Sequence, residues 1–407
     1  MNFEAVIGLE IHVEMKTKSK MFSSAPIDFK AEPNTLVAPL DMAFPGTMPI
    51  VNKEAVRNAI RVAHALHMQI DHELWFDRKN YFYSDLPKGY QITQQDRPIG
   101  KEGYLEIEVN GTKKKCEIER IHMEEDTCMQ HHFSSYSLLD YNRAGIPLIE
   151  IVSKPVLRSG LEARKYVEKI REIVTFANVS DGKMEEGSLR CDVNISIRPY
   201  GVETFGTKVE IKNLNSLAHI EKAIDFETKR QSELLLLGKK VQQETRRFDE
   251  AKKETVLMRV KTEAADYKYF VEPNIPPIKI SDEFINNAIE TCPELYDEKL
   301  ERFLNNYSLN LTDAKIILSN VDYANYYDSC AKYTSNYQNL ANFFISSILG
   351  YLNKAMIDIK DFNVDPKYIS ELVDLLTSKE INSTQGADIF AKLIKEKFAI
   401  HYIEVEG

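Results

Sequence analysis

The chain has 407 residues, of which 43% are hydrophobic and 10% aromatic, and its formal net charge is −10 at pH 7. This length suits two or three domains of an ordinary soluble protein. No run approaches the roughly 20 apolar residues of a membrane helix, and the acidic balance argues against DNA binding while allowing a local basic surface. The N-terminus shows no export pattern and the five cysteines are scattered, so we expect a cytoplasmic protein.

The first part of the chain is predicted to be rich in β-strands. Its predicted elements are a strand over residues 6–13, a helix from the capping residue Asn52 to about His67, and a hairpin of 105–109 and 116–121 around Asn110 and Gly111. Alternation in the first strand puts Glu10, His12 and Glu14 on one face and apolar residues on the other. The hairpin leads directly into the acidic run 122–126, so a rigid element delivers these carboxylates.

The middle of the chain combines helices with a strand of mixed character. Residues 159–162 form a capping-box pattern before a helix, and Ser216 is predicted to cap a second helix that Gly238 ends. Between the helices, residues 189–197 alternate so that one strand face carries Arg190, Asp192, Asn194 and Ser196. A polar face of this kind on an otherwise apolar strand indicates the floor of a binding site.

Towards the C-terminus the chain changes character twice. From Lys229 to Lys261, ten Lys and Arg stand against five Asp and Glu, a local net charge of +5. After Pro293 the pattern becomes helical. We therefore predict the α+β class. A first, strand-rich domain spans residues 1–292, and residues 293–407 form an all-α domain.

Acidic side chains recur at the ends or on the polar faces of apolar strands. Mg²⁺ binds a few converging hard oxygen ligands, and like charges at this density repel unless a cation offsets them. Any single acidic pair is more simply explained as part of a solvated surface, and a lone histidine more often has a structural role than a metal-binding one. Their repetition favours one shared cation site, for which the candidates are Glu10, His12, Glu124, Glu125, Glu150, Glu185, Glu186, Asp192 and Glu210.

Basic and amide groups are available to meet a phosphate. Metal ions with Lys or Arg neutralise developing charge on phosphoryl oxygens, and the candidates are Arg78, Lys79, Asn80, Arg190, Lys208, Lys212 and Asn213. The sequence has no glycine-rich phosphate loop and no dinucleotide fingerprint. It also has no serine elbow and no cysteine in a glutaminase-like setting, so any amide nitrogen that its reaction consumes must be released by another chain.

A series of short motifs runs in order from residue 6 to about 277. They are Val6–Glu14, Arg78–Tyr83, Leu86–Gln91, His122–Asp126, Asp140–Glu150, Lys183–Asp192, Lys208–Ser216, Glu244–Phe248, Met258-Arg259 and Asp266-Tyr267. This series resembles the B-subunit family of the aspartyl/glutamyl-tRNA amidotransferases. The resemblance implies a ligase that forms carbon–nitrogen bonds with glutamine as amido donor. Proteins of this family use ATP and Mg²⁺ to convert the side-chain carboxylate of Glu on tRNA(Gln), or Asp on tRNA(Asn), to an acyl phosphate, which ammonia then attacks.

The resemblance also implies a fold, partners and site residues. In the expected fold, residues 1–292 form a cradle on a mixed, largely antiparallel sheet with flanking helices, and a helical domain follows. The partners are a glutaminase A subunit that supplies ammonia, a small C subunit and the misacylated tRNA. Glu10, His12 and Glu125 rank first as Mg²⁺ ligands, with Glu124, Asp192 and Glu210 in or beside the shell. Catalytic roles are expected for Glu125, Asp192, Arg190 and Lys79, and substrate or ATP contacts for Lys208, Asn194, Lys212, Asn213 and Glu150.

Two departures from the family pattern matter. Relatives carry paired cysteines that could hold zinc, whereas those positions here are Ser23, Ala25, Ala38 and Asp41, so we expect no zinc. The chain ends at Gly407, about where a tRNA-binding tail domain would begin. We therefore expect that domain to be absent and the grip on tRNA to be weaker.

Two other functions compete with this interpretation. A non-catalytic assembly or tRNA-binding scaffold would explain a dependence on partners, but it leaves the strand-face pattern of Glu10, His12, Asp192 and Asn194 unused. A free-standing ligase that joins a small-molecule carboxylate to an amine predicts activity without tRNA or a glutaminase partner.

Overall fold

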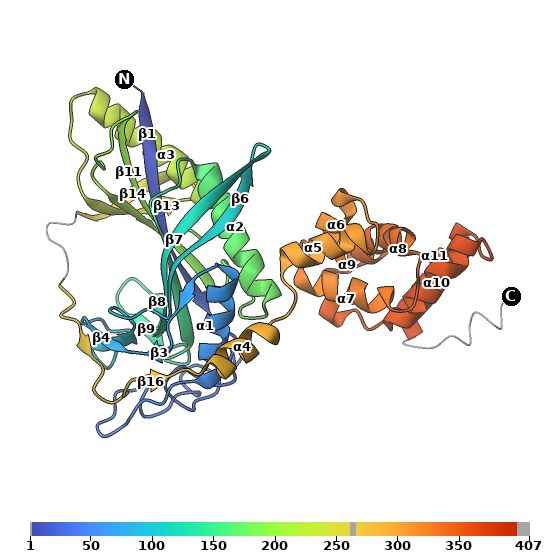
Figure 1. The fold of residues 1–407 in the computed structure, drawn as a ribbon, viewed down its shortest axis with the longest axis horizontal. Coiled ribbons are helices and arrows are strands. Elements are labelled where there is room, and N and C mark those ends of the chain that lie inside the picture. Colours follow the sequence, from blue (N-terminus) through green and yellow to red (C-terminus); the bar gives the residue numbers. More distant parts are fainter. Residues whose placement is uncertain (1, 261–265, 397–407) are drawn as a thin grey trace. The chain divides into compact units, whose positions relative to one another are not determined.

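The chain divides into two compact units, Met1–Pro293 and Glu294–Gly407, and each is described by itself. The computed structural model describes residues 2–260 and 266–396, and Figure 1 shows the elements of both units. The first unit combines a large sheet with helices, and the elements described in the second are all helical. The predicted α+β class is therefore confirmed.

A nine-stranded sheet forms the body of the first unit. Its strands, in spatial order, are β14 (Glu254–Val260), β13 (Glu244–Asp249), β12 (Val209–Lys212), β11 (Leu189–Pro199), β1 (Phe3–Glu14), β10 (Pro147–Ser153), β7 (Thr112–Glu125), β6 (Gly100–Val109) and β2 (Gln69–Ile70). Neighbouring strands run antiparallel except for β12 and β13, which pair in parallel. The sheet is thus mixed and largely antiparallel, as predicted, with β1 at its centre.

One face of this sheet is covered by helices. Helices α2 (Gly160–Phe176) and α3 (Leu217–Leu236) pack against each other and along the sheet (Figure 1). The apolar residues Ile7 and Ile11 of β1 are fully buried, which leaves the polar side chains of that strand for the other face. At Gly160 the two helices approach closely, because a Cβ there would lie 2.5 Å from the carbonyl oxygen of Glu221.

The predicted helix starts are confirmed by side chains that accept hydrogen bonds from first-turn N–H groups: Asn52 for α1 (Lys53–Ala65), Ser159 for α2 and Ser216 for α3. The prediction of a complete capping box at Ser159 is wrong, because the Glu162 side chain does not bond back to the Ser159 backbone N–H. The Glu162 carboxylate accepts instead from the backbone N–H of Arg158 at 2.8 Å and from Lys114 Nζ at 2.6 Å. This carboxylate therefore ties α2 to β7.

The predicted hairpin is confirmed, but its second strand is longer than expected. Asn110 and Gly111 both have positive φ, 52° and 76°, as a type I′ turn requires. They join β6 to β7, and β7 continues through Glu125. The acidic run therefore lies largely inside a central strand rather than after one.

The first unit also contains three smaller sheets, one of three strands and two of two strands. In one, β4 (Asp77–Asn80) lies between β15 (Phe270–Val271) and β5 (Tyr90–Thr93), and β5 lies against β7. Helix α4 (Asp282–Glu290) packs on α1. The remaining pairs are β16 (Ile278–Lys279) with β3 (Glu73–Leu74), and β8 (Met129–His132) with β9 (Ser137–Asp140).

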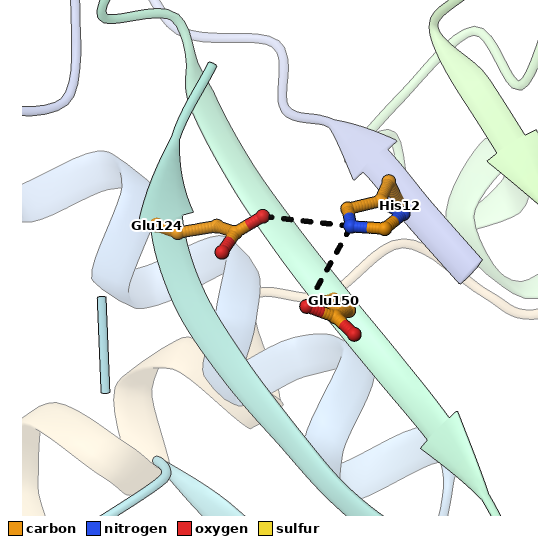
Figure 2. A group of neighbouring side chains, drawn as sticks. All are labelled: His12, Glu124 and Glu150. Atoms are coloured by element: carbon orange, nitrogen blue, oxygen red, sulfur yellow. Dashed lines mark ion pairs between the residues drawn. The ribbon is translucent and has the colours of Figure 1, made fainter. Parts of the chain in front are cut away.

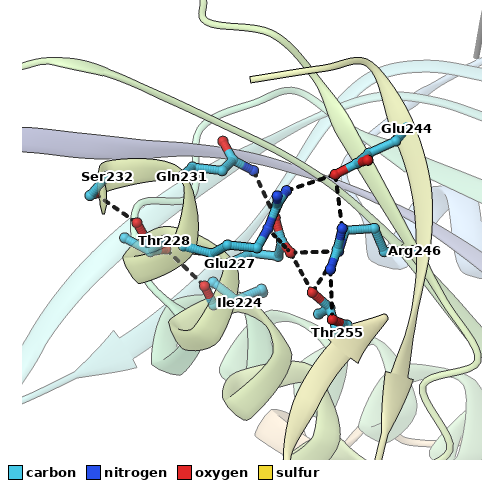
Figure 3. A network of polar contacts seen from close by, with 9 residues as sticks. Ile224, Glu227, Thr228, Gln231, Ser232, Glu244, Arg246 and Thr255 are labelled. Carbon is cyan, nitrogen blue, oxygen red and sulfur yellow. Dashed lines mark hydrogen bonds and ion pairs between the residues drawn. The ribbon is translucent and has the colours of Figure 1, made fainter. Parts of the chain in front are cut away.

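The basic stretch from Lys229 to Lys261 is partly structural rather than a free basic surface (Figure 3). Arg230 Nε lies 2.9 Å and Arg246 Nε 3.0 Å from Oε1 of Glu227, a fully buried carboxylate. Both arginines also lie 2.9 Å from Oε1 of Glu244. Two of the cations counted from the sequence are thus neutralised inside the fold, while Lys261 lies outside the described residues.

The second unit is helical throughout its described part. Its elements are α5 (Tyr296–Asn305), α6 (Leu311–Ile317), α7 (Val321–Ala331), α8 (Tyr337–Phe343), the π-helix η1 (Phe344–Ile348), α9 (Leu349–Ala355), the 3₁₀-helix η2 (Ile359–Asp361), α10 (Pro366–Ser378) and α11 (Ser383–Glu396). Buried aromatic rings form its core, with Tyr327 packed against Phe303 and Phe344 at centroid distances of 5.4 and 6.1 Å. Among the residues described in both units, no helix is long and apolar enough to cross a membrane.

An ion-pair network beside this core makes the second unit sensitive to acid. Asp328 Oδ2 accepts from Lys299 Nζ at 2.6 Å and from Arg302 Nη2 at 2.8 Å. Burial raises the pKa of Asp328, but the hydrogen bonds from Arg302 and Lys299 outweigh burial and hold the pKa below its ordinary value. A carboxylate with a lowered pKa stabilises the fold above its unfolded pKa and loses this contribution as the pH falls through the folded value.

We expect Asp328→Asn to reduce the free energy of unfolding by roughly 2–4 kcal/mol at pH 7, because Lys299 and Arg302 lose their shared carboxylate. Urea midpoints of the full chain, followed by circular dichroism, should keep their full difference down to about pH 4, the unfolded pKa of Asp, and converge only as the pH falls through the lower folded pKa. Asp388→Asn changes an exposed residue of α11 and should leave the midpoint unchanged. A wild-type advantage over Asp328→Asn that persists undiminished at pH 2 contradicts this linkage.

Candidate active site

Four side chains form one row across the centre of the sheet. The register places Arg190 of β11 beside His12 of β1, His12 beside Glu150 of β10, and Glu150 beside His122 of β7. Directly opposed residues share a face of the sheet, and each strand repeats that face at every second residue. The sheet therefore gathers one polar surface from four strands that are far apart in sequence.

Two histidines and two glutamates meet on this surface, and we call them the histidine–glutamate cluster: His12, His122, Glu124 and Glu150. His12 Nε2 lies 3.6 Å from both Glu124 Oε1 and Glu150 Oε2 (Figure 2). His122 Nε2 lies 3.0 Å from Glu150 Oε2 and 3.6 Å from Glu124 Oε2. Ligand atoms of His12, Glu124 and Glu150 all lie within 4.8 Å of one another, so these side chains converge.

The charges of this cluster depend on one another. Burial lowers the pKa of His122, but Glu150 and Glu124 outweigh burial and raise this pKa to about 9. The pKa of His12 is also raised, because the same two carboxylates outweigh its burial. Burial raises the pKa of Glu150, yet the two imidazoles hold this pKa well below its ordinary value. A cation that uses His12 as a ligand would therefore compete with a proton for that imidazole.

A second acidic group, which we call the lysine-bridged cluster, lies on the same face: Glu10, Asp192, Glu210 and Lys212. Its carboxylate oxygens lie within 4.8 Å of one another, and Lys212 Nζ lies 2.6 Å from Asp192 Oδ2 and 3.3 Å from Glu210 Oε1. Asn194 donates to Glu10 Oε1 at 2.9 Å. Burial and the charge of Glu150 raise the pKa of Glu10. The single expected cation site is thus resolved into two neighbouring, electrostatically coupled groups.

Two further cations border the histidine–glutamate cluster. Lys79 of β4 shares a sheet face with Thr93 of β5, and Thr93 Oγ1 lies 3.4 Å from Glu124 Oε2. Burial lowers the pKa of Lys79, but the nearby charges of Glu124 and Glu150 raise it above its ordinary value. Arg190 Nη2 donates to Asp126 Oδ2 at 2.6 Å. Burial and Asp126 raise the pKa of Glu14 to about 9, so Glu14 carries the proton and Asp126 keeps the charge that holds Arg190.

A cavity of about 520 Å³ opens beside both clusters. Its wall includes His12, Arg190, Asp192, Lys212 and Asn213. Residues 184–187 also line it, although Glu185 and Glu186 are exposed and Glu186 pairs with Lys183 at 2.6 Å. A smaller cavity of about 260 Å³ is lined by Glu10, Asn194 and the exposed Lys208. The candidates of the sequence thus border two adjoining spaces on one face of the sheet.

The structure does not bring Glu125 together with Glu10 and His12. Successive residues of a strand point to opposite faces, and it is Glu124 that faces His12. The Glu125 carboxylate instead forms a buried ion pair with Lys88 and accepts from the Ile92 backbone N–H at 3.0 Å. Glu125 therefore holds β5 and the loop before it against β7.

Two of the predicted phosphate-binding residues also have structural roles. Arg78 donates to the buried carboxylate of Glu272 at 2.6 and 3.1 Å. Asn80 donates to the backbone carbonyl oxygen of Lys268 at 2.8 Å. Both residues therefore hold the segment around 267–272 against β4, whereas Lys79, between them, lies on the strand face of Thr93, which contacts Glu124.

An ion pair joins the two segments, around residues 20–25 and 38–41, in which relatives carry cysteines and this chain does not. Lys20 Nζ lies 3.0 Å from Asp41 Oδ2, and both side chains are buried. Asp41 Oδ2 also accepts from the Ala38 backbone N–H at 2.8 Å. Charge pairing and a hydrogen bond therefore connect the segments that contain these two residues.

Three residues of the site were noticed in the sequence but not predicted as site residues: His122, Glu14 and Asp126. His122 shares the face of Glu124 by simple alternation, and this was the available signal. Its pairing with Glu150, itself a predicted site residue, could not be found in the same way, because the pairing depends on the register between β7 and β10. The pairing of Glu14 with Asp126 depends on the fold alone.

Two protein families match this chain. The family described as the GatB/GatE catalytic domain matches residues 5–286, and the one described as the GatB domain matches residues 325–405. The sheet, apart from the first two residues of β1, lies within the first match together with helices α1 to α3 and both clusters. They define a catalytic domain of the GatB/GatE class.

Curated relatives are similar over nearly the whole chain, and each is named as the B subunit of an aspartyl/glutamyl-tRNA(Asn/Gln) amidotransferase. The protein of Mesoplasma florum is 50% identical over 405 residues, which cover 99% of this chain and 85% of the relative. Those of Mycoplasma capricolum and Staphylococcus saprophyticus are 51% and 47% identical, covering 94% and 97% of this chain and 80% and 83% of the relatives. This chain belongs to the family of these B subunits.

Proposed function

We propose that this chain is the activating subunit of a tRNA-dependent amidotransferase. It uses ATP and Mg²⁺ to convert the side-chain carboxylate of Glu on tRNA(Gln), of Asp on tRNA(Asn), or of both, to an acyl phosphate. A glutaminase A subunit supplies the ammonia that completes the amide, and a small C subunit completes the heterotrimer. The shared name of the relatives supports this class of reaction and substrate.

The observation that carries the proposal is the meeting of cations and carboxylates on one sheet face. Lys79 lies on the strand face whose Thr93 contacts Glu124 of the histidine–glutamate cluster, and Arg190 and Lys212 line the cavity beside it. A protein catalyses phosphoryl transfer mainly by positioning the reacting groups and by neutralising charge on the phosphoryl oxygens. A row of paired cations and acids next to a cavity of about 520 Å³ supplies both.

The histidine–glutamate cluster fits a divalent cation. Glu124 and Glu150 offer the hard oxygen ligands that Mg²⁺ prefers, and His12 offers an imidazole nitrogen within 4.8 Å of both. His122 Nδ1 is buried and has no hydrogen-bond partner among the described residues, while Nε2 faces the two carboxylates. His122 therefore suits the outer shell, where it would orient the ligating carboxylates. Bound there, the cation would neutralise charge on the phosphoryl oxygens.

The residues of this chain bind and orient the reacting groups. Lys79 and Arg190 neutralise and align the substrate carboxylate and the γ-phosphoryl group. The carboxylate oxygen attacks phosphorus and ADP leaves; ammonia then attacks the carbonyl carbon of the acyl phosphate, loses a proton, and inorganic phosphate leaves. Lys212 and Asn213 at the larger cavity, and Asn194 and Lys208 at the smaller one, contact ATP and the aminoacyl group.

The test is phosphate release by the assembled heterotrimer with Mg²⁺ and ATP. Release should depend on misacylated tRNA, and Glu124→Gln should lower it at least about 10²-fold, because the cluster loses a charged oxygen ligand. Glu119→Gln changes an exposed residue of the same strand and should behave like the wild type. Size-exclusion chromatography checks that all three proteins assemble equally.

Each competing function has its own outcome in this assay. Phosphate release without tRNA indicates a ligase for a small molecule. Wild-type heterotrimer that binds tRNA but forms no acyl phosphate from ATP indicates a scaffold. Full activity in Glu124→Gln overturns the assignment of the histidine–glutamate cluster.

A further inference from the structure

A ladder of aromatic rings leads from the histidine–glutamate cluster to the surface of the first unit. Lys79 Nζ lies 4.8 Å from the ring centroid of Tyr267 and 5.9 Å from that of Tyr81. The Tyr81 ring meets those of Tyr267 and Tyr83 at 6.1 and 5.7 Å, and Tyr267 meets Tyr269 at 6.0 Å, all edge to face. The ladder thus begins at the lysine near the cluster and ends at Tyr83 and Tyr269.

The outer rings of this ladder and their chain neighbours are exposed, and we call them the aromatic platform: Phe82, Tyr83, Tyr269 and Phe270. Their exposed fractions are 90%, 60%, 39% and 49% respectively. Single exposed apolar residues are ordinary on protein surfaces, but a group of aromatic rings beside a functional site indicates a binding surface. None of the four belongs to the ligand sets considered above.

The platform is built on a rigid frame. Its two halves flank β4, which pairs with β5 on one side and with β15 on the other. The Arg78 guanidinium lies over the Tyr90 ring at 4.0 Å and over the Phe270 ring at 5.6 Å while it binds the buried Glu272. Rings held in this way lose little conformational entropy when a ligand binds, which favours binding.

We propose that the aromatic platform stacks the unpaired 3′-terminal bases of the tRNA while the attached amino acid reaches the histidine–glutamate cluster. This inference rests on the proposed function and adds a nucleotide subsite to it. The reacting carboxylate is tethered to the terminal ribose by a few bonds, so the terminal nucleotide must lie beside the cluster. The ladder of rings begins at that place.

The chemistry of the platform matches single-stranded nucleic acid. Every base has a π-face, so exposed aromatic rings bind unpaired bases with little sequence preference. Lys268 is exposed between Tyr267 and Tyr269 and offers positive charge to the phosphodiester backbone. A basic group at the tip of an otherwise aromatic surface favours RNA over an apolar protein partner.

A thermodynamic cycle tests the contact. Dissociation constants of the heterotrimer are measured without ATP for uncharged tRNA and for the same tRNA lacking its 3′-terminal nucleotide. For the wild type, removing the nucleotide should weaken binding roughly 10-fold, the effect of one stacked base. The double variant Phe82→Leu, Tyr83→Leu should bind intact tRNA roughly 10-fold more weakly and should no longer distinguish the two RNAs. The proposal is overturned if the double substitution and the removal of the nucleotide weaken binding by independent factors, so that the double variant still distinguishes the two RNAs.

Matched variants separate stacking from structural damage. Tyr83→Phe keeps the ring and should bind both RNAs like the wild type. Tyr333→Leu removes a similarly exposed ring, 54%, in the second unit, and its discrimination between the RNAs should stay intact. Failure of the double variant to assemble into the heterotrimer would make the platform a protein interface and overturn the proposal. Because the cycle uses no ATP, its outcome is independent of whether acyl phosphate forms.

Discussion

Glu150→Gln is expected to lower tRNA-dependent phosphate release by the heterotrimer about 10³-fold or more. Glu150 Oε2 lies 3.0 Å from His122 Nε2 and 3.6 Å from His12 Nε2. Glutamine keeps the size of the side chain but removes the charge that raises the pKa of both imidazoles. The cluster would therefore lose an anionic ligand and the charge that aligns its two histidines.

The measurement pairs activity with metal affinity. Mn²⁺ binding, followed by electron paramagnetic resonance, should weaken about 10- to 100-fold or more in Glu150→Gln. Glu125→Gln is the matched control, because this neighbour of Glu124 faces away from the cluster and pairs with Lys88. It should keep Mn²⁺ affinity, although it disturbs the loop before β5. Weaker Mn²⁺ binding in Glu125→Gln but not in Glu150→Gln would restore Glu125 as the ligand and contradict the present assignment.

Glu227→Gln is expected to reduce the free energy of unfolding by roughly 3–5 kcal/mol, because it removes one of two buried carboxylates and leaves Arg230 and Arg246 to share the charge of Glu244. Glu227 is fully buried and accepts from Arg230 Nε at 2.9 Å and Gln231 Nε2 at 3.0 Å, and its Oε1 lies 3.0 Å from Arg246 Nε (Figure 3). Burial raises the pKa of Glu227, but its hydrogen bonds from Arg230 and Thr255 hold the pKa below its ordinary value. The amide would also place donors against guanidinium donors.

Urea unfolding of the full chain, followed by circular dichroism, checks this prediction. Glu233→Gln on the same helix removes an exposed carboxylate that lies 4.0 Å from Lys229 and should change stability by less than about 1 kcal/mol. Because the network of Glu227 joins α3 to β13 and β14, Glu227→Gln should shift the midpoint without altering phosphate release at temperatures where the fold persists. Equal, small shifts in both variants would show that the network contributes little.

Local rules identified the elements of the first unit well. Caps at Asn52, Ser159 and Ser216 depend on hydrogen bonds within one helical turn, and the turn at Asn110-Gly111 depends on two backbone conformations. All of these are encoded in a few neighbouring residues. The prediction of a capping box at Ser159 was wrong because the Glu162 carboxylate pairs with Lys114, which lies on a strand that is distant in sequence.

Charge counts along the chain were less reliable, for the same reason. The excess of Lys and Arg between 229 and 261 suggested a basic surface, yet Arg230 and Arg246 are bound by Glu227 and Glu244 inside the fold. Glu227 lies just outside that stretch, so counting within it missed the compensating charge. Net charge over a segment describes a surface only after the buried pairs have been removed.

The sequence by itself determined which side chains share a strand face, because that periodicity depends only on the local backbone. It thus placed Glu10 with His12, and Arg190 with Asp192 and Asn194. Only the tertiary structure decided which faces meet. The pairing of β1 with β10 and of β10 with β7 brings Glu150 and His122 to His12 and turns Glu124, not Glu125, towards them. Register between distant strands is set by the packing of the whole sheet, and no local pattern reports it.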